Sequence, residues 1–300
     1  APITESFDVL LAVQPSSLGP EQMVNLVAAV KAGQPVAIFE DPLPVLMQGV
    51  PGTSQPRRSP MGPMAMFGGQ QGQPKGDLNL LWEALGTRLE AVSGRPAMGQ
   101  MGSAPSIVYQ DYNPHLKLEL PSEFVFIDAN LEGAEPGFNQ GVPATGGLQE
   151  VLFPFPGALD KIDGADMTWT PLVRTVADRS GTIEVDEVER LLGRGDMRQL
   201  QIFEKRSEKS LVLAVMVEGA KSSESAEPAT REPGEEQQAT NPEGQAARPV
   251  RAVIVADIDL LDGRIFGLRT RPDEVFGLDF DNVEFVLNVL DSLAGDDRFV

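Results

Sequence analysis

Three groups of polar residues each follow an apolar run and could together form a site. Ser16 and Ser17 follow the first run, Asp41 the second, and Asp257 and Asp259 a run near the end of the chain. In open α/β sheets, ligands bind outside the carboxyl ends of the strands. If the three runs are neighbouring strands, these side chains face one crevice. Clustered carboxylates favour a cationic or hydroxyl-rich ligand, or a basic partner surface, over an anionic one.

The plainer alternative is that these residues only shape turns, because Asp and Ser are ordinary residues of turns and caps. The pair Asp257 and Asp259 could also bind a hard cation. Calcium, however, takes about 6–8 oxygen ligands, and no further ligand cluster is visible in the sequence. The sequence therefore predicts a site for a ligand or a partner, with no metal and no cofactor.

Other reactive groups are few. The chain has no cysteine, which excludes disulfides, thiolate nucleophiles and cysteine-based metal sites. The single histidine, His115, lacks the context of a catalytic triad, and we predict a surface loop residue. Thioether sulfurs are soft Cu(I) ligands, but low-complexity composition is the simpler explanation for the clustered methionines Met61, Met64, Met66, Met98 and Met101. The common motifs for phosphate binding, dinucleotide binding, serine hydrolysis and zinc proteolysis are absent.

The stretch from Phe7 to Pro42 predicts the unit that positions the first two groups. Phe7 to Val13 is apolar and typical of a strand buried on both faces, as in a parallel sheet. Pro20 is suited to start a helix. Apolar residues then recur at helical spacing, at Met23, Leu26, Val27 and Val30. Val36 to Phe39 is the next strand, and the whole predicts a right-handed strand–helix–strand crossover.

The same patterns continue along the chain. Helices are expected at 78–85, 185–192 and 282–294. Strands are expected at 107–109, 124–127, 168–176, 200–203, 211–217 and 250–256, with a loop or edge at 151–160. Strands that alternate with helices predict an α/β fold, a layered and mostly parallel sheet flanked by helices. We expect residues 1–300 to form one domain.

Two stretches interrupt this domain. Residues 44–77 are rich in Met, Gly and Pro, and residues 220–249 form an acidic linker without aromatic or large aliphatic side chains. Neither can bury enough apolar surface to offset about 1–2 kcal/mol of backbone entropy per residue, so we predict mobility in both.

The charge balance limits the classes of partner. Lys and Arg number 24 and Asp and Glu number 44, a formal net charge of -20. So much negative charge argues against binding to nucleic acid or to anionic membrane surfaces. No segment approaches the roughly 20 apolar residues of a membrane span, and we expect an excised fragment of a longer protein.

A set of short segments resembles the auxiliary components of bacterial ABC-type transport systems, which include the gliding-motility protein GldG. In the opening unit the matching residues are Pro15, Ser17, Leu18, Gln22, Gly33, Pro35, Val36, Asp41 and Pro42. Further matches, in order, are FPGALD at 155–160, TPLVRT at 170–175, LAVMVEG at 213–219, VIVADIDLL at 253–261 and DNVEFVLNVLDSLAGDD at 281–297. Each segment is weak alone, but their order makes the set more specific.

The resemblance implies a glutamine-amidotransferase-like (flavodoxin-like) fold without the catalytic cysteine. It also implies an extracytoplasmic (periplasmic) region of a protein anchored in the bacterial inner membrane, with an ABC permease and ATPase as partners. We therefore expect a non-catalytic ligand- or partner-binding module. The alternatives are a carboxylate-dependent hydrolase that uses Asp41 and Asp257, and a soluble scaffold with no small ligand.

Overall fold

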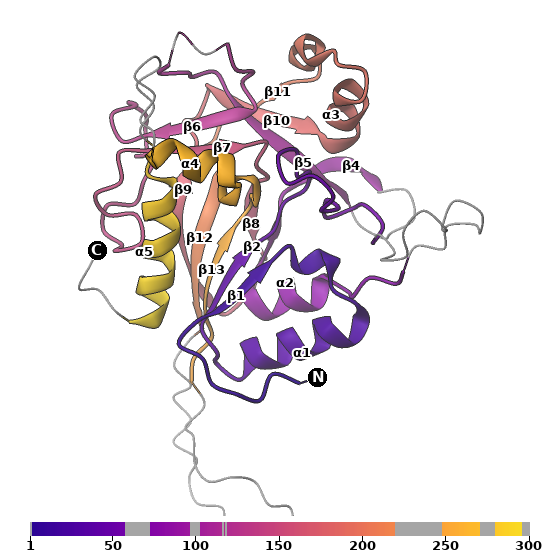
Figure 1. Cartoon of the computed structure of the whole chain (residues 1–300), viewed down its shortest axis with the longest axis vertical. Helices are drawn as coiled ribbons and strands as arrows, with labels where there is room; N and C mark the ends of the chain where they lie inside the picture. The colour runs from indigo at the N-terminus through magenta and orange to yellow at the C-terminus, as the bar shows by residue number, and fades with distance from the viewer. Residues whose placement is uncertain are drawn as a thin grey trace, which may run out of the picture.

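The computed structural model describes residues 2–57, 73–96, 103–115, 117, 119–219, 248–270 and 280–295 (Figure 1). Its strands are β1 (Leu10–Val13), β2 (Val36–Phe39), β3 (Thr87–Leu89), β4 (Ala91–Pro96), β5 (Ser103–Gln110), β6 (Phe124–Asp128), β7 (Glu150–Pro154), β8 (Leu159–Lys161), β9 (Met167–Arg174), β10 (Ser180–Glu184), β11 (Lys205–Arg206), β12 (Val212–Gly219) and β13 (Arg251–Val255). Its α-helices are α1 (Pro20–Lys31), α2 (Asn79–Leu85), α3 (Val185–Leu192), α4 (Gly263–Thr270) and α5 (Asn282–Ala294). Three 3₁₀ turns are η1 (Pro15–Ser17), η3 (Met197–Ile202) and η4 (Asp259–Leu261).

The main sheet has seven strands in the order β1-β2-β13-β12-β8-β3, with β9 also paired to β12. β1, β2 and β13 are parallel, whereas β12 is antiparallel to β13 and to both β8 and β9. The expectation of a mostly parallel sheet is therefore corrected: the fold is α/β, but the sheet is mixed. The physical reason is that a parallel pair needs a crossover packed on its own sheet. The chain between β9 and β12 contains α3, but α3 packs on β5 and β10 of a smaller sheet, and β12 returns antiparallel to β9.

Helices cover both faces of this sheet (Figure 1). On one face, α1 and α2 pack on side chains such as Val36 and Ile38 of β2 and Ile254 of β13. On the other face, α5 packs on the alternate residues of the same strands. Because successive side chains of a strand point to opposite faces, each buried strand contributes to two cores.

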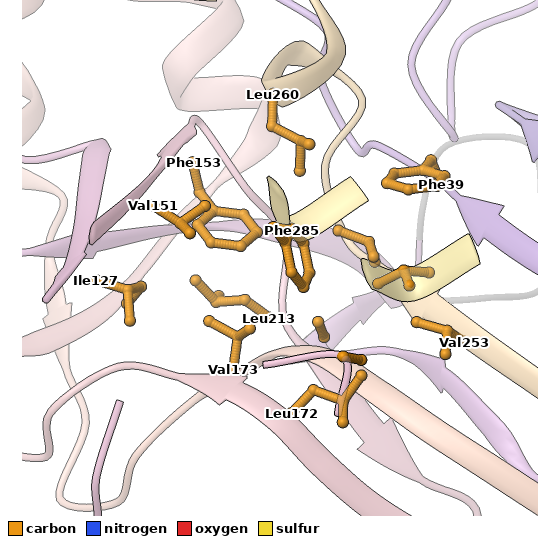
Figure 2. Packing of buried hydrophobic residues seen from close by; sticks show 14 of the residues in the cluster. Phe39, Ile127, Val151, Phe153, Leu172, Val173, Leu213, Val253, Leu260 and Phe285 are labelled. Carbon is orange, nitrogen blue, oxygen red and sulfur yellow. The ribbon is translucent and has the colours of Figure 1, made fainter. Parts of the chain in front are cut away.

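The larger core lies under α5 (Figure 2). Phe285 enters it from the helix and meets Phe153 of β7, with ring centroids 6.0 Å apart. Phe39, Val253 and Leu213 line the sheet beneath. Burial of a large apolar side chain contributes roughly 1.5–3 kcal/mol, so this helix is held mainly by its inner face.

Two smaller sheets complete the described fold. One contains β11-β10-β5-β4 and packs on α3, and the other is the antiparallel pair β6-β7. The sequence 151–160, expected as a loop or edge, forms β7 and β8 instead. The strand expected at 200–203 is wrong, because these residues belong largely to the 3₁₀ turn η3, with only Leu200 buried.

β1 also differs from its prediction. Its burial alternates, with Leu11 and Val13 exposed, because β1 is the outer strand of the sheet. A strand at the edge has no further strand beside it, and here α5 lies over β2 and β13 instead. β2, the next strand in the sheet, has all four residues buried.

The two predicted interruptions fall partly outside the described residues: 58–72 of the first and 220–247 of the second. The described part of the first is anchored. Pro51 and Gly52 are buried, and Val45 packs against the core that contains Phe155 and Ile107.

Candidate functional site

The five predicted site residues lie at one edge of the main sheet, where β1, β2 and β13 end. Ser16 and Ser17 form part of η1 directly after β1, and Asp41 follows β2. Asp257 and Asp259 follow β13, which is parallel to β2 and hydrogen-bonded to it. The carboxyl ends of these three strands therefore meet, as the parallel crossover requires.

Asp41 links two of these ends. One oxygen, Oδ1, accepts the N–H of Leu43 at 2.7 Å, and Oδ2 accepts the N–H of Ile258 at 3.1 Å. The side chain is fully buried. Burial, and then the nearby charge of Asp259, hold the pKa of Asp41 well above its usual range. Asp41 thus joins the segment after β2 to the segment after β13.

Asp259 holds the loop that leaves β2. Its Oδ2 accepts the N–H groups of Val45 and Leu46 at 2.6 and 2.8 Å, and its Oδ1 accepts that of Met47 at 2.8 Å. Three successive backbone N–H groups that converge on one oxyanion form an anion-binding nest. Burial raises the pKa of Asp259, although these three hydrogen bonds oppose the rise. The nest is filled by the chain's own carboxylate.

Asp257 differs from its neighbours because half of its carboxylate is unused. Its Oδ1 accepts the N–H groups of Asp259 at 2.6 Å and Leu260 at 3.3 Å. Its Oδ2 is buried and has no hydrogen-bond partner among the residues that the structure describes. Burial and the charges of Asp41 and Asp259 raise the pKa of Asp257 well above its ordinary value. A carboxyl group in these surroundings favours the protonated form.

Sequence reasoning missed Gln14, which lies at the same edge. Its backbone adopts the left-handed region at φ 50°, unusual for a residue other than glycine. Its side chain accepts the N–H of Asp41 at 3.0 Å and donates to the carbonyls of Asp41 and Pro51, at 2.8 and 3.0 Å. These three bonds fix the buried amide and tie β1 to the loop after β2. No local sequence signal distinguishes this glutamine from a surface one.

Glu40 is the second residue that the sequence analysis missed. It is fully buried, and its oxygens accept the Ser16 N–H at 2.9 Å and the Thr53 hydroxyl at 2.5 Å. Burial raises its pKa, while these hydrogen bonds and the charge of Lys75 oppose the rise. Lys75 Nζ donates to the carbonyls of Gly52 and Thr53 at 3.3 and 2.9 Å, and partial burial lowers the pKa of Lys75. The sequence does contain one signal for this residue, because Glu40 directly follows the apolar run that forms β2.

This arrangement determines what the edge can do chemically. The carboxylates of Asp41, Asp257 and Asp259 point into the protein and bind backbone N–H groups of neighbouring segments. Within the described ranges, no group of three or more acidic or histidine side chains is arranged to hold a metal ion. The edge therefore fixes the shape of the loop at 43–53, and presents that loop rather than free carboxylates.

His115 corrects a prediction. It was expected on the surface, but it is largely buried between the rings of Phe126 and Phe280, with centroids 5.6 and 5.5 Å away. Its Nε2 lies 2.8 Å from Oε1 of Glu150. Phe126 belongs to β6 and Phe280 lies two residues before α5, so their proximity depends on the tertiary structure. These contacts of His115 are two aromatic rings and one carboxylate, which pack and hold the imidazole.

Comparison with known proteins identifies the family of this chain. No curated protein matches the chain significantly. Among the described residues, no helix is both long enough and apolar enough to span a membrane. A family model described as an ABC-type uncharacterized transport system matches residues 1–289, and the chain therefore belongs to this family of ABC transport auxiliary components.

Proposed function

We propose that this chain is a non-catalytic partner-binding module of an auxiliary protein in an ABC transport system. The observation that carries the proposal is the use of the edge carboxylates. In Asp41 and Asp259, both carboxylate oxygens accept hydrogen bonds from backbone N–H groups. These side chains therefore hold the loop in place and are not free to contact a substrate. Family membership supports the transport context.

We extend this proposal to the subfamily, the partner subunits and the location. The ordered sequence matches favour a GldG-like, gliding-motility-type auxiliary protein, whose permease and ATPase subunits are the partners. They also favour an extracytoplasmic location, a membrane anchor in the full-length protein and an amidotransferase-like fold. The lack of cysteine supports a role without catalysis, because such a fold then has no thiolate nucleophile.

The predicted site residues have a defined part in this proposal. Ser16, Ser17, Asp41, Asp257 and Asp259 form the edge, and the loop at 43–53 that they hold contacts the ligand or partner. The whole chain, residues 1–300, forms one domain, and the remainder of that domain supports this edge. The stretches at 44–77 and 220–249 are excursions from it.

Co-purification tests this function. The full-length protein is tagged in its own cells, and membranes are solubilised in mild detergent. We expect the permease and ATPase to be recovered with the wild type and with the exposed control Asp166→Asn. Asp259→Asn releases the loop and should reduce recovery at least about fivefold, since one or two charge-assisted hydrogen bonds are lost.

If the chain were a hydrolase, it would turn over a substrate. Turnover of an ester, amide or glycoside panel by the wild type, abolished by Asp41→Ala or Asp257→Ala, would overturn the proposal. Recovery of neither transport subunit would do the same.

The location is testable because the chain lacks cysteine. Asp166→Cys supplies one exposed thiol in this chain, and the full-length protein without the substitution gives the background labelling. In intact spheroplasts we expect labelling by a membrane-impermeant maleimide. Labelling only after lysis would place the domain on the cytoplasmic side.

A further inference from the structure

The outer edge of the main sheet lies at β1, which has a partner strand on one side only in the described part of the chain. Leu10 and Gln14 donate their N–H groups to carbonyls of the β2 segment, at 2.8 and 2.7 Å. In a parallel pair, alternate residues bond to the same neighbour, so Leu11 and Val13 direct their N–H and C=O groups away from β2. Such an edge is a template for another strand.

The side chains of these two residues are exposed as well. Leu11 is 49% and Val13 is 41% exposed. Leu10 and Ala12 pack in the core under α1 and α2, so Leu11 and Val13 lie on the opposite face, the face that α5 covers. α5 packs on β2 and β13, the two strands next to β1 in the sheet, and not on β1 itself at the level of these contacts.

α5 covers the inner part of this face. Its buried residues include Phe285, Val289 and Leu293, which pack in the core that β2 and β13 line. At 3.6 residues per turn, Leu287 lies roughly 160° around the helix from the centre of this buried face, so its side chain points to solvent and not toward β1. The exposed apolar side chains at the open edge are therefore those of Leu11 and Val13.

We propose that the open edge of β1 binds an extended segment of a partner protein, which adds a strand to the sheet. The partner's alternate side chains are apolar and cover an apolar strip that we define as Leu11 and Val13. This inference rests on the proposed function, since the partner is then a component of the transport system. The binding surface at β1 is separate from the loop at 43–53.

Charge decides between the possible occupants. Asp8 is exposed directly before β1, and the whole chain carries a formal net charge of -20. A second copy of this chain would bring the same charge to the edge, and like charges oppose self-association. A strand with basic residues at its ends complements the edge. Backbone hydrogen bonds give such a strand its affinity, and the side-chain strip gives it selectivity.

A model peptide tests the edge without any transport subunit. The probe is a blocked peptide of alternating valine and threonine with lysine at both ends. We expect it to shift the NMR amide signals of Leu11 and Val13 and to slow their hydrogen exchange. The matched peptide with glutamate at both ends should bind at least about fivefold more weakly, because its charge repels the acidic chain.

Three variants locate the binding. Leu11→Pro removes an outward N–H, which edge strands tolerate, and Val13→Ser removes an exposed apolar side chain while it keeps the backbone donors. Each should weaken lysine-peptide binding at least about fivefold, as the loss of one net hydrogen bond or one apolar contact predicts. The control Ile202→Ser changes a side chain that is 74% exposed on η3, and should bind like the wild type. If Leu11→Pro lowers the thermal midpoint, Val13→Ser alone decides the test.

Several results would overturn the inference. These are binding of both peptides with equal affinity, no binding of either, shifts away from β1, or unchanged binding by Val13→Ser. A dimer in sedimentation that Leu11→Pro dissociates would assign the edge to a second copy. The proposed function fails separately: if neither permease nor ATPase co-purifies, the transport partnership is wrong, whatever the peptides do. If both co-purify equally well with wild type and Val13→Ser, only the edge assignment is wrong.

Discussion

The Asp259 carboxylate gives the sharpest test of the site's architecture. It accepts three backbone N–H groups from Val45, Leu46 and Met47 at 2.6–2.8 Å. A hydrogen bond to a charged group contributes about 1.5–3 kcal/mol net. The three donors are only half-buried, so water recovers part of the loss when the carboxylate is removed. We expect Asp259→Ala to lower the free energy of unfolding by about 4 kcal/mol.

Asp259→Asn is the conservative version of this change. The amide keeps one acceptor oxygen, which can still bind the two donors that share Oδ2, but its NH₂ group then faces the third N–H. The expected loss is about 2 kcal/mol. Urea titration followed by circular dichroism measures both variants, with the exposed Asp166→Asn as the control, expected within about 0.5 kcal/mol of wild type.

Hydrogen exchange separates a local from a global effect. In Asp259→Asn, the amides of Val45, Leu46 and Met47 should lose protection before those of β2 and β13. An unfolding free energy within about 0.5 kcal/mol of wild type for Asp259→Ala, together with unchanged exchange at 45–47, would refute the claim that this carboxylate holds the loop.

Three further predictions concern pH, the core and a turn. Burial, and then the charges of Glu204 and Asp111, raise the pKa of Glu123 from 4.5 to about 7. Its protonated form therefore stabilises the fold below about pH 4.5, and this contribution of roughly 3 kcal/mol is lost as pH rises through 7. Glu123→Gln should remove that pH dependence in urea titrations at pH 4.5 and 8, and a curve parallel to wild type would contradict it. Phe285→Ala should cost about 3–5 kcal/mol in the same assay, whereas a loss below about 1 kcal/mol would mean that α5 is not held by its inner face. Gly33→Ala should lower the thermal midpoint and cost about 2 kcal/mol, because φ is +80° and a Cβ would lie 2.4 Å from the Arg248 carbonyl oxygen; an unchanged midpoint would contradict this.

Local sequence patterns determined the opening unit and the last helix. The predicted strand at 36–39 has the bounds of β2, and the predicted helix at 282–294 has the bounds of α5. Pro20, the apolar stripe of α1 and Gly33 after its end carry this information within a few residues of chain. The position of Asp41 and Asp257 at strand ends follows from the same runs, since a parallel crossover brings carboxyl ends together.

Only the tertiary structure decided the rest. β12 pairs antiparallel with both β13 and β9, and the order of strands in a sheet is set by contacts between residues far apart in sequence. The same is true of burial in α5, where Phe285 and Val289 pack against the sheet and Leu287 is exposed. Gln14 has no distinctive local pattern, and Glu40 has only its place directly after the apolar run of β2. Their importance comes from partners that folding brings to them, Pro51 and Thr53, because a buried polar group is stable only when its hydrogen bonds are satisfied.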